Sequence, residues 1–425
     1  MVGGGAWWWT QQPDFTSADP EKLAYKLPDK PSIAVLPFEN FTGDPKQDYL
    51  CDGMTENIIA VLSTSPDLFV IARNSIFKGK ATKVQDVAEK LGVRYVLEGS
   101  VQRSGDKLRV VAQLVDAIDG KHLSARHYDR ELQDLFALYD GISKDIALGM
   151  HVNLTIGEWG KSWVKAVGAT ETFRLRVLGR SRLNSSTAAG LKEAEDLFLE
   201  SHKREPDNAL ANLMLASVHI QKLMMGLSTD PLSDLAKAQS FMDKAQSVME
   251  SGIGFSLVAT LKLFATGHSA ALAQAEHAIE LDPTGSETIA LAGTVKTFCG
   301  KVPHAIVFLR RAMRLQPYHP IWMPAMLGFA HLQLGENEAA EQIFESIMST
   351  ANVDGFFYRL ALSNISAIAV FEGDMDKARE YLARVLKKNP TGNAYHVAQQ
   401  LYFLKDQEFV QRYVAALRKA GLPEY

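Results

Sequence analysis

The spacing of apolar residues changes once along this chain. Up to about residue 130, short apolar runs alternate with polar turns, which is typical of strands. Beyond about residue 165, apolar residues recur every three or four positions, which is typical of helices. The pattern predicts an α+β protein. A small mixed-sheet α/β domain over residues 32–158 is followed by an all-α domain over residues 165–425.

The first predicted domain begins with two strand–helix units. Residues 32–38 form a short apolar run typical of a buried strand, and residues 48–64 carry apolar side chains at helical spacing. A second apolar run over residues 68–72 is followed by a short helix over residues 84–91. Gly92 is expected to end that helix, because glycine adopts the left-handed conformation found at helix ends.

Three further strands are predicted between residues 94 and 128. Gly105-Asp106 and Asp119-Gly120 separate the alternating segments, and such dipeptides favour hairpin turns because they tolerate positive φ. A helix over residues 132–155 is expected to close the domain. Two strand–helix units followed by a meander predict a mixed sheet with helices packed on it.

The second predicted domain has an internal repeat. Pro283 and Pro317 lie 34 residues apart, which is the period of tetratricopeptide helical hairpins. The residues before each proline keep one register, with Ala312, Leu309, Ala305 and Gly300 before Pro317, and Ala278, Ala275 and Ala271 before Pro283. Small residues let two helices cross closely, and proline ends the second helix because its ring clashes with the preceding turn. One hairpin cannot bury its apolar face alone, so the hairpins are expected to stack into a superhelix.

The repeat pattern extends over the rest of the second domain. Pro206 and Pro390 are preceded by small and apolar residues in a similar register. Residues 226–231 lengthen one hairpin as a loop, and residues 392–421 are predicted to form a capping helix with a polar face.

The N-terminal segment allows two interpretations. Trp7, Trp8 and Trp9 indicate the end of a membrane helix over residues 1–9, because indole rings favour the membrane interface. No Lys or Arg follows until Lys22, which favours a periplasmic position for residues 10–425. Alternatively, this N-terminus is a disordered segment with an accidental tryptophan cluster, and the chain is cytoplasmic. Prolines among polar residues predict a linker over residues 10–31.

Composition excludes several classes of protein. The 425 residues are 47% hydrophobic and 22% charged, which supplies enough apolar surface to exclude disorder of the whole chain. The net charge is −4, and the chain has no long run of Lys and Arg, which argues against a nucleic-acid partner. Cys51 and Cys299 lie in different predicted domains, so cysteine alone builds neither a disulfide framework nor a zinc site.

The sequence contains no recognisable catalytic or metal-binding motif. Asp116 and Asp119 are the closest carboxylate pair, and they flank a hairpin turn, where a solvated turn is favoured over a metal site. His122 and His127 are five residues apart, which places them on opposite faces of a strand. Gly3-Gly4-Gly5 lacks the Lys and Ser/Thr of a phosphate loop. We therefore predict a chain that is not an enzyme and that uses no cofactor or metal. The alternative is an enzyme with its site in the α/β domain.

Two sets of residues are candidates for binding. Repeat superhelices present a concave groove, lined by the first helix of each hairpin, that suits a protein or peptide. The groove candidates are Asn212, His219, Lys296, Phe329, His331 and Asn364. Each of them is alternatively part of an ordinary helix face, and the two histidines are alternatively packing residues. In the α/β domain, Arg73, Asn74 and Ser75 follow a strand end where loops can gather a ligand, or they are structural loop residues.

Several motifs in the first domain resemble a known family. Over residues 31–155 the chain resembles the TolB amino-terminal-like (FlgO-like) domain. The motifs that carry the resemblance are Ile33-Ala34-Val35-Leu36-Pro37-Phe38, Asp52-Gly53-Met54-Thr55-Glu56, Ile71-Ala72-Arg73-Asn74-Ser75, Leu91-Gly92-Val93-Arg94-Tyr95-Val96-Leu97-Glu98-Gly99-Ser100 and Tyr128-Asp129-Arg130. The chain departs from its relatives at Ser124, where a tryptophan is common, and over residues 139–142.

Such a domain followed by tetratricopeptide repeats is similar to the C-terminal half of bacterial class III adenylate cyclases. The resemblance implies a sensory and regulatory region of a membrane-anchored signalling protein, with a cyclase domain upstream that would act as a homodimer. A second set of relatives carries a winged-helix DNA-binding domain in the upstream position, so the regulatory part of a transcription regulator is the alternative. The resemblance implies binding of a protein or peptide partner through the repeats.

The repeat register makes a prediction about helix crossing. Replacing Ala305 with Leu should overpack the crossing of its hairpin and lower the free energy of unfolding by about 1–3 kcal/mol. Urea denaturation followed by far-ultraviolet circular dichroism measures the effect. An unchanged transition would show that the register is wrong.

Overall fold

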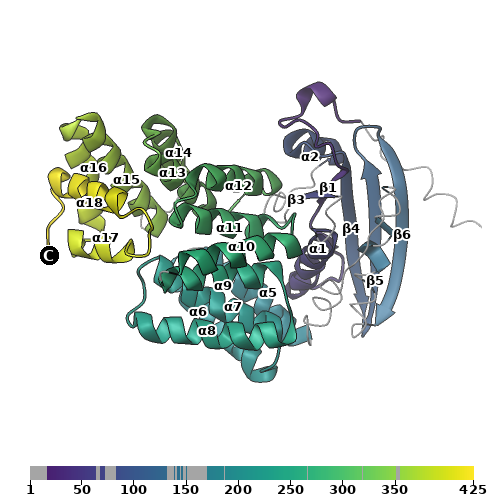
Figure 1. The fold of residues 1–425 in the computed structure, drawn as a ribbon. Coiled ribbons are helices and arrows are strands. Elements are labelled where there is room, and N and C mark those ends of the chain that lie inside the picture. The colour runs from purple at the N-terminus through teal and green to yellow at the C-terminus, as the bar shows by residue number, and fades with distance from the viewer. Residues whose placement is uncertain are drawn as a thin grey trace, which may run out of the picture. The chain divides into compact units, whose positions relative to one another are not determined.

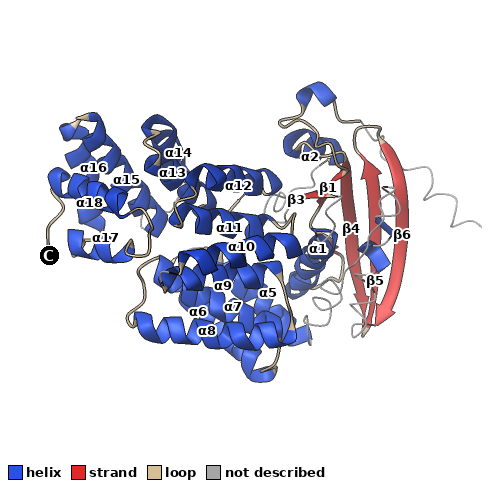
Figure 2. Ribbon diagram, in the orientation of Figure 1, coloured by secondary structure: helices blue, strands red, loops and turns tan. Residues whose placement is uncertain are grey.

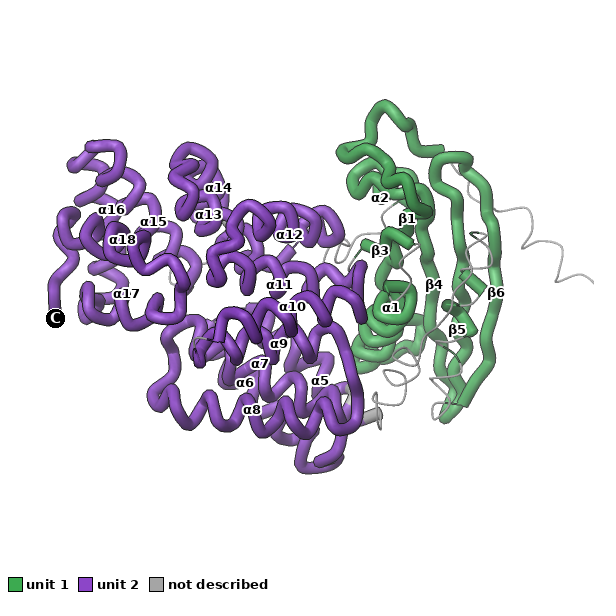
Figure 3. Tube along the Cα trace, in the orientation of Figure 1, with its two compact units in different colours: residues 1–156 green, residues 157–425 purple. Residues whose placement is uncertain are grey.

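The computed structural model describes most of the chain. The described residues are 17–63, 68–71, 83–131, a few helical positions between 138 and 150, and 170–425 without 186, 266, 318 and 351–354. The chain divides into two compact units, the α/β unit over residues 1–156 and the repeat unit over residues 157–425 (Figure 3). Each unit has its own hydrophobic core.

The α/β unit is built on one mixed sheet (Figures 1 and 2). Its strands are β1 (Ser32–Val35), β2 (Glu39–Asn40), β3 (Phe69–Ile71), β4 (Tyr95–Ser104), β5 (Lys107–Asp116) and β6 (Lys121–Glu131). The strand order is β3-β1-β4-β5-β6, and β2 pairs with β4 off this path. Strand β1 runs parallel to both β3 and β4, while β4, β5 and β6 form the antiparallel meander. The predicted mixed sheet is confirmed.

Side chains from helices pack on both faces of the sheet. Helix α1 (Asp48–Ser63) contributes Ile58 and Leu62 to a core that includes Val110 of β5. Helix α2 (Val84–Leu91) contributes Val87 to a second core that includes Val96 of β4. Neighbouring strand residues point to opposite faces, so Val96 and Leu97 enter the two different cores. Gly92 ends α2 at φ 60°, as predicted.

Part of the predicted linker over residues 10–31 is bonded to the α/β unit. Ala18 is buried, and its backbone N–H donates to the carbonyl of Ala117 over 2.7 Å. Ala24 donates in the same way to the carbonyl of Glu89 over 2.7 Å. Residues 18–24 are therefore anchored to the α/β unit by backbone hydrogen bonds, which proline content does not reveal. A short 3-10 helix, η2 (Pro20–Lys22), lies within this segment.

The predicted membrane helix end over residues 1–9 lies outside the described residues. Among the residues that are described, none of the helices combines the length and apolar character needed to cross a bilayer.

The repeat unit consists of successive helical hairpins. Its helices are α5 (Thr170–Leu183), α6 (Ala188–Arg204), α7 (Ala209–Met224), α8 (Pro231–Val248), α9 (Gly252–Phe264), α10 (His268–Leu281), α11 (Ser286–Phe298), α12 (Val302–Leu315), α13 (Trp322–Gln333), α14 (Asn337–Thr350), α15 (Phe356–Glu372), α16 (Met375–Lys388), α17 (Ala394–Gln400) and α18 (Gln407–Ala420). Helices α9 and α11 begin 34 residues apart, and so do α10 and α12, so the predicted tetratricopeptide period is confirmed. The expected loop separates α7 from α8.

Small residues lie at the helix crossings, as the repeat register predicts. Ala305, Leu309 and Ala312 of α12 are fully buried. A side chain on Gly293 of α11 would come within 3.0 Å of Leu309 Cγ, which shows how closely the two helices approach. On the same helix, Val307 is 64% exposed and provides a control position for the Ala305 substitution.

The C-terminal end differs from the single predicted capping helix. The structure has two helices there, α17 and α18, and residues 401–406 separate them. Asp406 ends the interruption because its carboxylate accepts a hydrogen bond from the Phe409 N–H and so caps the start of α18. A local capping signal therefore divides a segment whose apolar spacing suggested one helix.

The close approach of β4 and β5 makes a prediction about the α/β unit. A side chain on Gly99 would lie 2.5 Å from the carbonyl oxygen of Val111 and 2.3 Å from the ring of Phe38. We expect Gly99→Ala to destabilise the sheet by about 1–3 kcal/mol through overpacking. Hydrogen exchange of the β5 amides should then accelerate at least several-fold, since local opening becomes easier. Ser100→Ala on the same strand is the control, and equal exchange in both variants would contradict the prediction.

Candidate partner-binding surface

The first helices of the hairpins are mostly buried, although α5 exposes Leu178, Ser181 and Arg182. No residue of α7, α11 or α13 is more than partly exposed. The second helices differ, since α12 exposes Val307, Arg310 and Arg311 among others. The described surface of the repeat unit therefore belongs mainly to the second helices and to the turns.

All six groove candidates lie on first helices, but five of them are buried. Their exposed fractions are 0% for Asn212, 3% for His219, 5% for Phe329, 3% for His331 and 0% for Asn364. Side chains that are covered to this extent do not line an open groove, so this expectation does not fit these five residues. Contact with a partner stays a prediction for Lys296, whose side chain is also largely covered at 12% exposure.

The two asparagines satisfy carbonyl groups of the backbone. The side-chain amide of Asn212 donates to the carbonyls of Pro206 and Asn208, each over 3.0 Å. The amide of Asn364 donates to the carbonyl of Leu360 over 2.8 Å. These bonds lie within the first turns of α7 or within α15, so both residues support local helix structure.

His219 lies in a buried polar network that joins α6, α7 and α8. Its Nδ1 donates to Asp234 over 2.6 Å, and the other carboxylate oxygen of Asp234 accepts from the Ser228 hydroxyl over 2.6 Å. Its Nε2 lies 3.8 Å from Glu195, which also pairs with Lys222 over 2.7 Å. Burial alone would raise the pKa of Asp234, yet the hydrogen bonds from Ser228 and His219 hold that pKa below its ordinary value.

This network does not form a nucleophile with its base. In a serine hydrolase the imidazole lies between the serine and the acid, whereas here the carboxylate of Asp234 lies between Ser228 and His219. The Ser228 hydroxyl donates to the carboxylate, so the imidazole is not placed to accept its proton.

The two cysteine thiols are poor nucleophiles. Burial raises the pKa of Cys51 to about 12 and that of Cys299 to about 11, so both thiols stay protonated near neutral pH.

The remaining groove candidates contact their neighbours in the array. His331 pairs through Nδ1 with Glu336, and its Nε2 lies 3.4 Å from the Arg310 guanidinium. The Lys296 ammonium lies 5.1 Å from the ring centre of Phe308 and 3.6 Å from Glu276. The contacts with Arg310 and Glu276 link consecutive hairpins, and those with Glu336 and Phe308 lie within one hairpin.

Phe329 belongs to a ladder of aromatic rings that sequence reasoning missed. Its ring centre lies 6.2 Å from that of Phe298 in α11 and 5.7 Å from that of Phe409 in α18. Phe403, between α17 and α18, continues the ladder to Phe264 in α9. Phe264 and Phe298 lie 34 residues apart, so the repeat period carried a signal that could have identified them.

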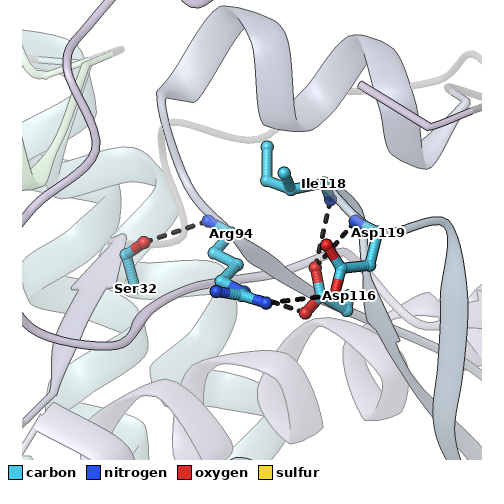
Figure 4. A network of polar contacts seen from close by, with 5 residues as sticks. All are labelled: Ser32, Arg94, Asp116, Ile118 and Asp119. Carbon is cyan, nitrogen blue, oxygen red and sulfur yellow. Dashed lines mark hydrogen bonds and ion pairs between the residues drawn. The ribbon is translucent and has the colours of Figure 1, made fainter. Parts of the chain in front are cut away.

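In the α/β unit, the carboxylate pair at the hairpin turn is engaged within the chain (Figure 4). Asp116 is 3% exposed, accepts from Arg94 Nε over 2.8 Å, and accepts from the backbone N–H groups of Ile118 and Asp119. Asp119 pairs with another nitrogen of Arg94 over 3.2 Å. The backbone N–H of Arg94 donates to the Ser32 hydroxyl, so the network joins the start of β1 to the hairpin turn. Arg94 therefore pairs with both carboxylates, while its own side chain and that of Asp119 stay exposed to solvent at the turn.

Other predicted positions give no second site. His122 and His127 are both exposed on β6. Arg73, Asn74 and Ser75 lie outside the described residues, so their role as a ligand loop stays a prediction. Among the described residues, no group of three or more His, Cys, Asp or Glu side chains is arranged to hold a metal ion.

Comparison with known proteins identifies one relative with clear sequence similarity. The chain is 39% identical over 245 residues to "Putative adenylate cyclase 3" of Rhizobium meliloti (strain 1021). The match covers 55% of this chain and 42% of that protein, so the chain spans less than half of the relative's length. No family model matches the chain.

Solved structures with low sequence identity resemble parts of the chain. The structure described as "YrrB: a TPR protein with an unusual peptide-binding site" is 16% identical, with a TM-score of 0.31, and covers 46% of this chain and 93% of its own. PilF of Pseudomonas aeruginosa is 15% identical, with a TM-score of 0.35, and covers 52% of this chain and 93% of its own. TolB from Acinetobacter baumannii is 19% identical, with a TM-score of 0.24, and covers 30% of each chain.

The buried network makes a prediction about pH. We expect Asp234→Asn to destabilise the repeat unit by about 1–3 kcal/mol at pH 7, because it removes a charged acceptor of two buried hydrogen bonds. The pKa of Asp234 is lowered in the folded state, so its stabilisation is present above the unfolded pKa of about 3.9 and is lost as the pH falls below it. The difference between wild type and variant should therefore shrink from pH 7 to about pH 2.5, with most of the change below pH 4.

Urea denaturation followed by circular dichroism at the two pH values measures this difference. Asp243→Asn on the same helix, where the carboxylate is exposed, is the matched control. A difference that stays constant with pH would show that the ionised form of Asp234 contributes nothing.

Proposed function

We propose that this chain is a sensory, regulatory and protein-binding region of a bacterial signalling protein of adenylate cyclase type. The observation that carries the proposal is the 39% identity over 245 residues to a protein named as an adenylate cyclase. The chain spans 42% of that relative, which leaves more than half of the relative for other domains. In this proposal cyclase catalysis belongs to a domain outside the matched region.

A regulatory role is also supported by the chemistry of the described residues. Two-metal nucleotide chemistry needs carboxylates that are free to bind cations. Asp116 instead accepts hydrogen bonds from Arg94 and from two backbone N–H groups, and Asp234 accepts from His219 and Ser228. In this proposal the chain contributes binding and positioning, and it performs no reaction of its own.

The repeat unit supplies a protein-binding role. Arrays of helical hairpins present extended surfaces that bind peptides and other proteins without needing a catalytic centre. In our proposal the α/β unit is TolB-like and senses a signal, and residues 1–9 attach the protein to a membrane with the remainder in the periplasm. Two copies would associate through the cyclase domain.

A cyclase assay tests the proposed division of labour. The purified 425-residue chain, incubated with ATP and Mg²⁺ or Mn²⁺, is expected to form no cyclic AMP. In the source cells, an antibody against residues 170–425 is expected to detect a membrane-bound protein longer than this chain, and those membranes should form cyclic AMP. Cyclic AMP formation by the purified chain would overturn the regulatory assignment. A soluble protein of 425 residues would overturn the membrane-anchored one.

A further inference from the structure

The segment between α17 and α18 folds back across the repeat array. We call residues 401–406 the C-terminal strap. It contacts the ends of hairpins that precede it by more than 100 residues, and the contacts involve Phe264, His268 and Phe298. A side chain on Gly226, at the end of the α7–α8 hairpin turn, would also come within 2.2 Å of the Gln400 amide.

The strap inserts one aromatic ring between two repeats. The ring centre of Phe403 lies 5.1 Å from that of Phe264 and 5.0 Å from that of Phe298, in edge-to-face arrangements. The two partner rings occupy the last residue of α9 and of α11, and they are equivalent in the 34-residue repeat. Phe403 is 5% exposed and the adjacent Leu404 is 1% exposed, so both side chains of the strap are buried in the repeat unit.

Hydrogen bonds to helix ends hold the strap in register. The backbone N–H of Lys405 donates to the carbonyl of Phe298 over 2.8 Å, and the Tyr402 hydroxyl donates to the carbonyl of Phe264. These are carbonyls of the last helical turn, which have no partner within their own helix. His268 Nε2 donates to the carbonyl of Phe403 over 2.9 Å. The site therefore recognises backbone groups as well as side chains, as sites for extended peptides do.

The strap is attached more loosely than the helix that follows it. It forms a turn instead of a helix, and Tyr402 and Lys405 are exposed. The connection before α17 is the polar segment Asn389-Pro390-Thr391-Gly392-Asn393, in which only Gly392 and Asn393 are even partly covered. The strap and α18 both enter the main core of the repeat unit, to which the strap contributes only Phe403 and Leu404 as buried residues. In contrast, α18 contributes seven buried residues, among them Phe409, Tyr413 and Leu417.

We propose that the notch between Phe264 and Phe298 is a peptide-binding site that the chain's own strap occupies until a partner displaces it. The partner it fits is a protein segment with an aromatic residue followed by leucine, in which the backbone N–H two residues after the aromatic donates to the Phe298 carbonyl. This inference rests on the proposed protein-binding function. To that function it adds two points. The strap competes with the partner for the same site, and the partner segment that binds there contains an aromatic residue.

Peptide binding to the full chain tests this proposal. The probe is a fluorescent peptide with the sequence of residues 399–407, measured by fluorescence anisotropy. Phe403→Ala empties the notch, and we expect this variant to bind the peptide at least tenfold more tightly than wild type. A peptide in which the phenylalanine is replaced by alanine should bind neither protein. Phe371→Ala, at an exposed aromatic residue outside the strap, is the control and should bind as weakly as wild type.

A second variant and a hydrogen-exchange measurement test the proposal independently of the Phe403→Ala variant. If Phe403→Ala does not fold, Phe403→Leu retains apolar volume and is compared with wild type in the same assay. In unmodified protein, the Lys405 amide should exchange with solvent at least tenfold faster than the amides of α18, because the strap opens locally. Equal peptide binding by folded variant and wild type, or exchange of Lys405 only at the rate of α18, would overturn the proposal. Neither result depends on cyclase activity. The proposed function is tested separately by the cyclase assay and the antibody experiment described above.

Discussion

Close crossing of helices at alanine and glycine is the constraint on which the repeat unit depends. At these positions the backbones approach closely enough for Leu309 to lie against Gly293, and Ala305 and Ala312 are fully buried. No single hairpin encloses its own apolar residues, so each first helix is covered by its partner and by the next hairpin. Larger side chains at the crossings would separate the helices and expose the core on which every neighbouring repeat relies.

The same packing explains why five of the six predicted groove residues are buried. A mostly buried first helix keeps polar side chains at less cost when they are hydrogen-bonded, because an unsatisfied buried polar group is costly. Asn212 and Asn364 satisfy backbone carbonyls, and His219 is satisfied by Asp234. Their polarity suggested a ligand, whereas the structure uses it to support helices and to join hairpins. The peptide-binding site that we propose lies instead at the ends of the hairpins, where the strap packs.

The α/β unit and the repeat unit use charged residues in a similar way. Arg94 neutralises Asp116 and Asp119 at a turn of the sheet, and His219 with Ser228 holds Asp234 between three helices. In both places a carboxylate that sequence reasoning could consider for chemistry is saturated by neighbouring donors.

The sequence by itself determined the features that depend on local spacing. Alternation with period two and recurrence every three or four residues predicted the strands and the helical hairpins, and the 34-residue period predicted the repeat, because these patterns follow from backbone geometry. Only the tertiary structure decided which faces are covered. His219 lies beside Glu195 of the preceding hairpin and Phe329 beside Phe409 of α18, and the contact of Phe403 with Phe264 joins segments more than 100 residues apart. The N-terminal segment shows the same limit, since prolines predicted a linker while distant backbone partners at Glu89 and Ala117 anchored it. Local sequence patterns determine which secondary structure a segment can form. Burial and hydrogen bonding between distant segments depend on how the whole unit packs.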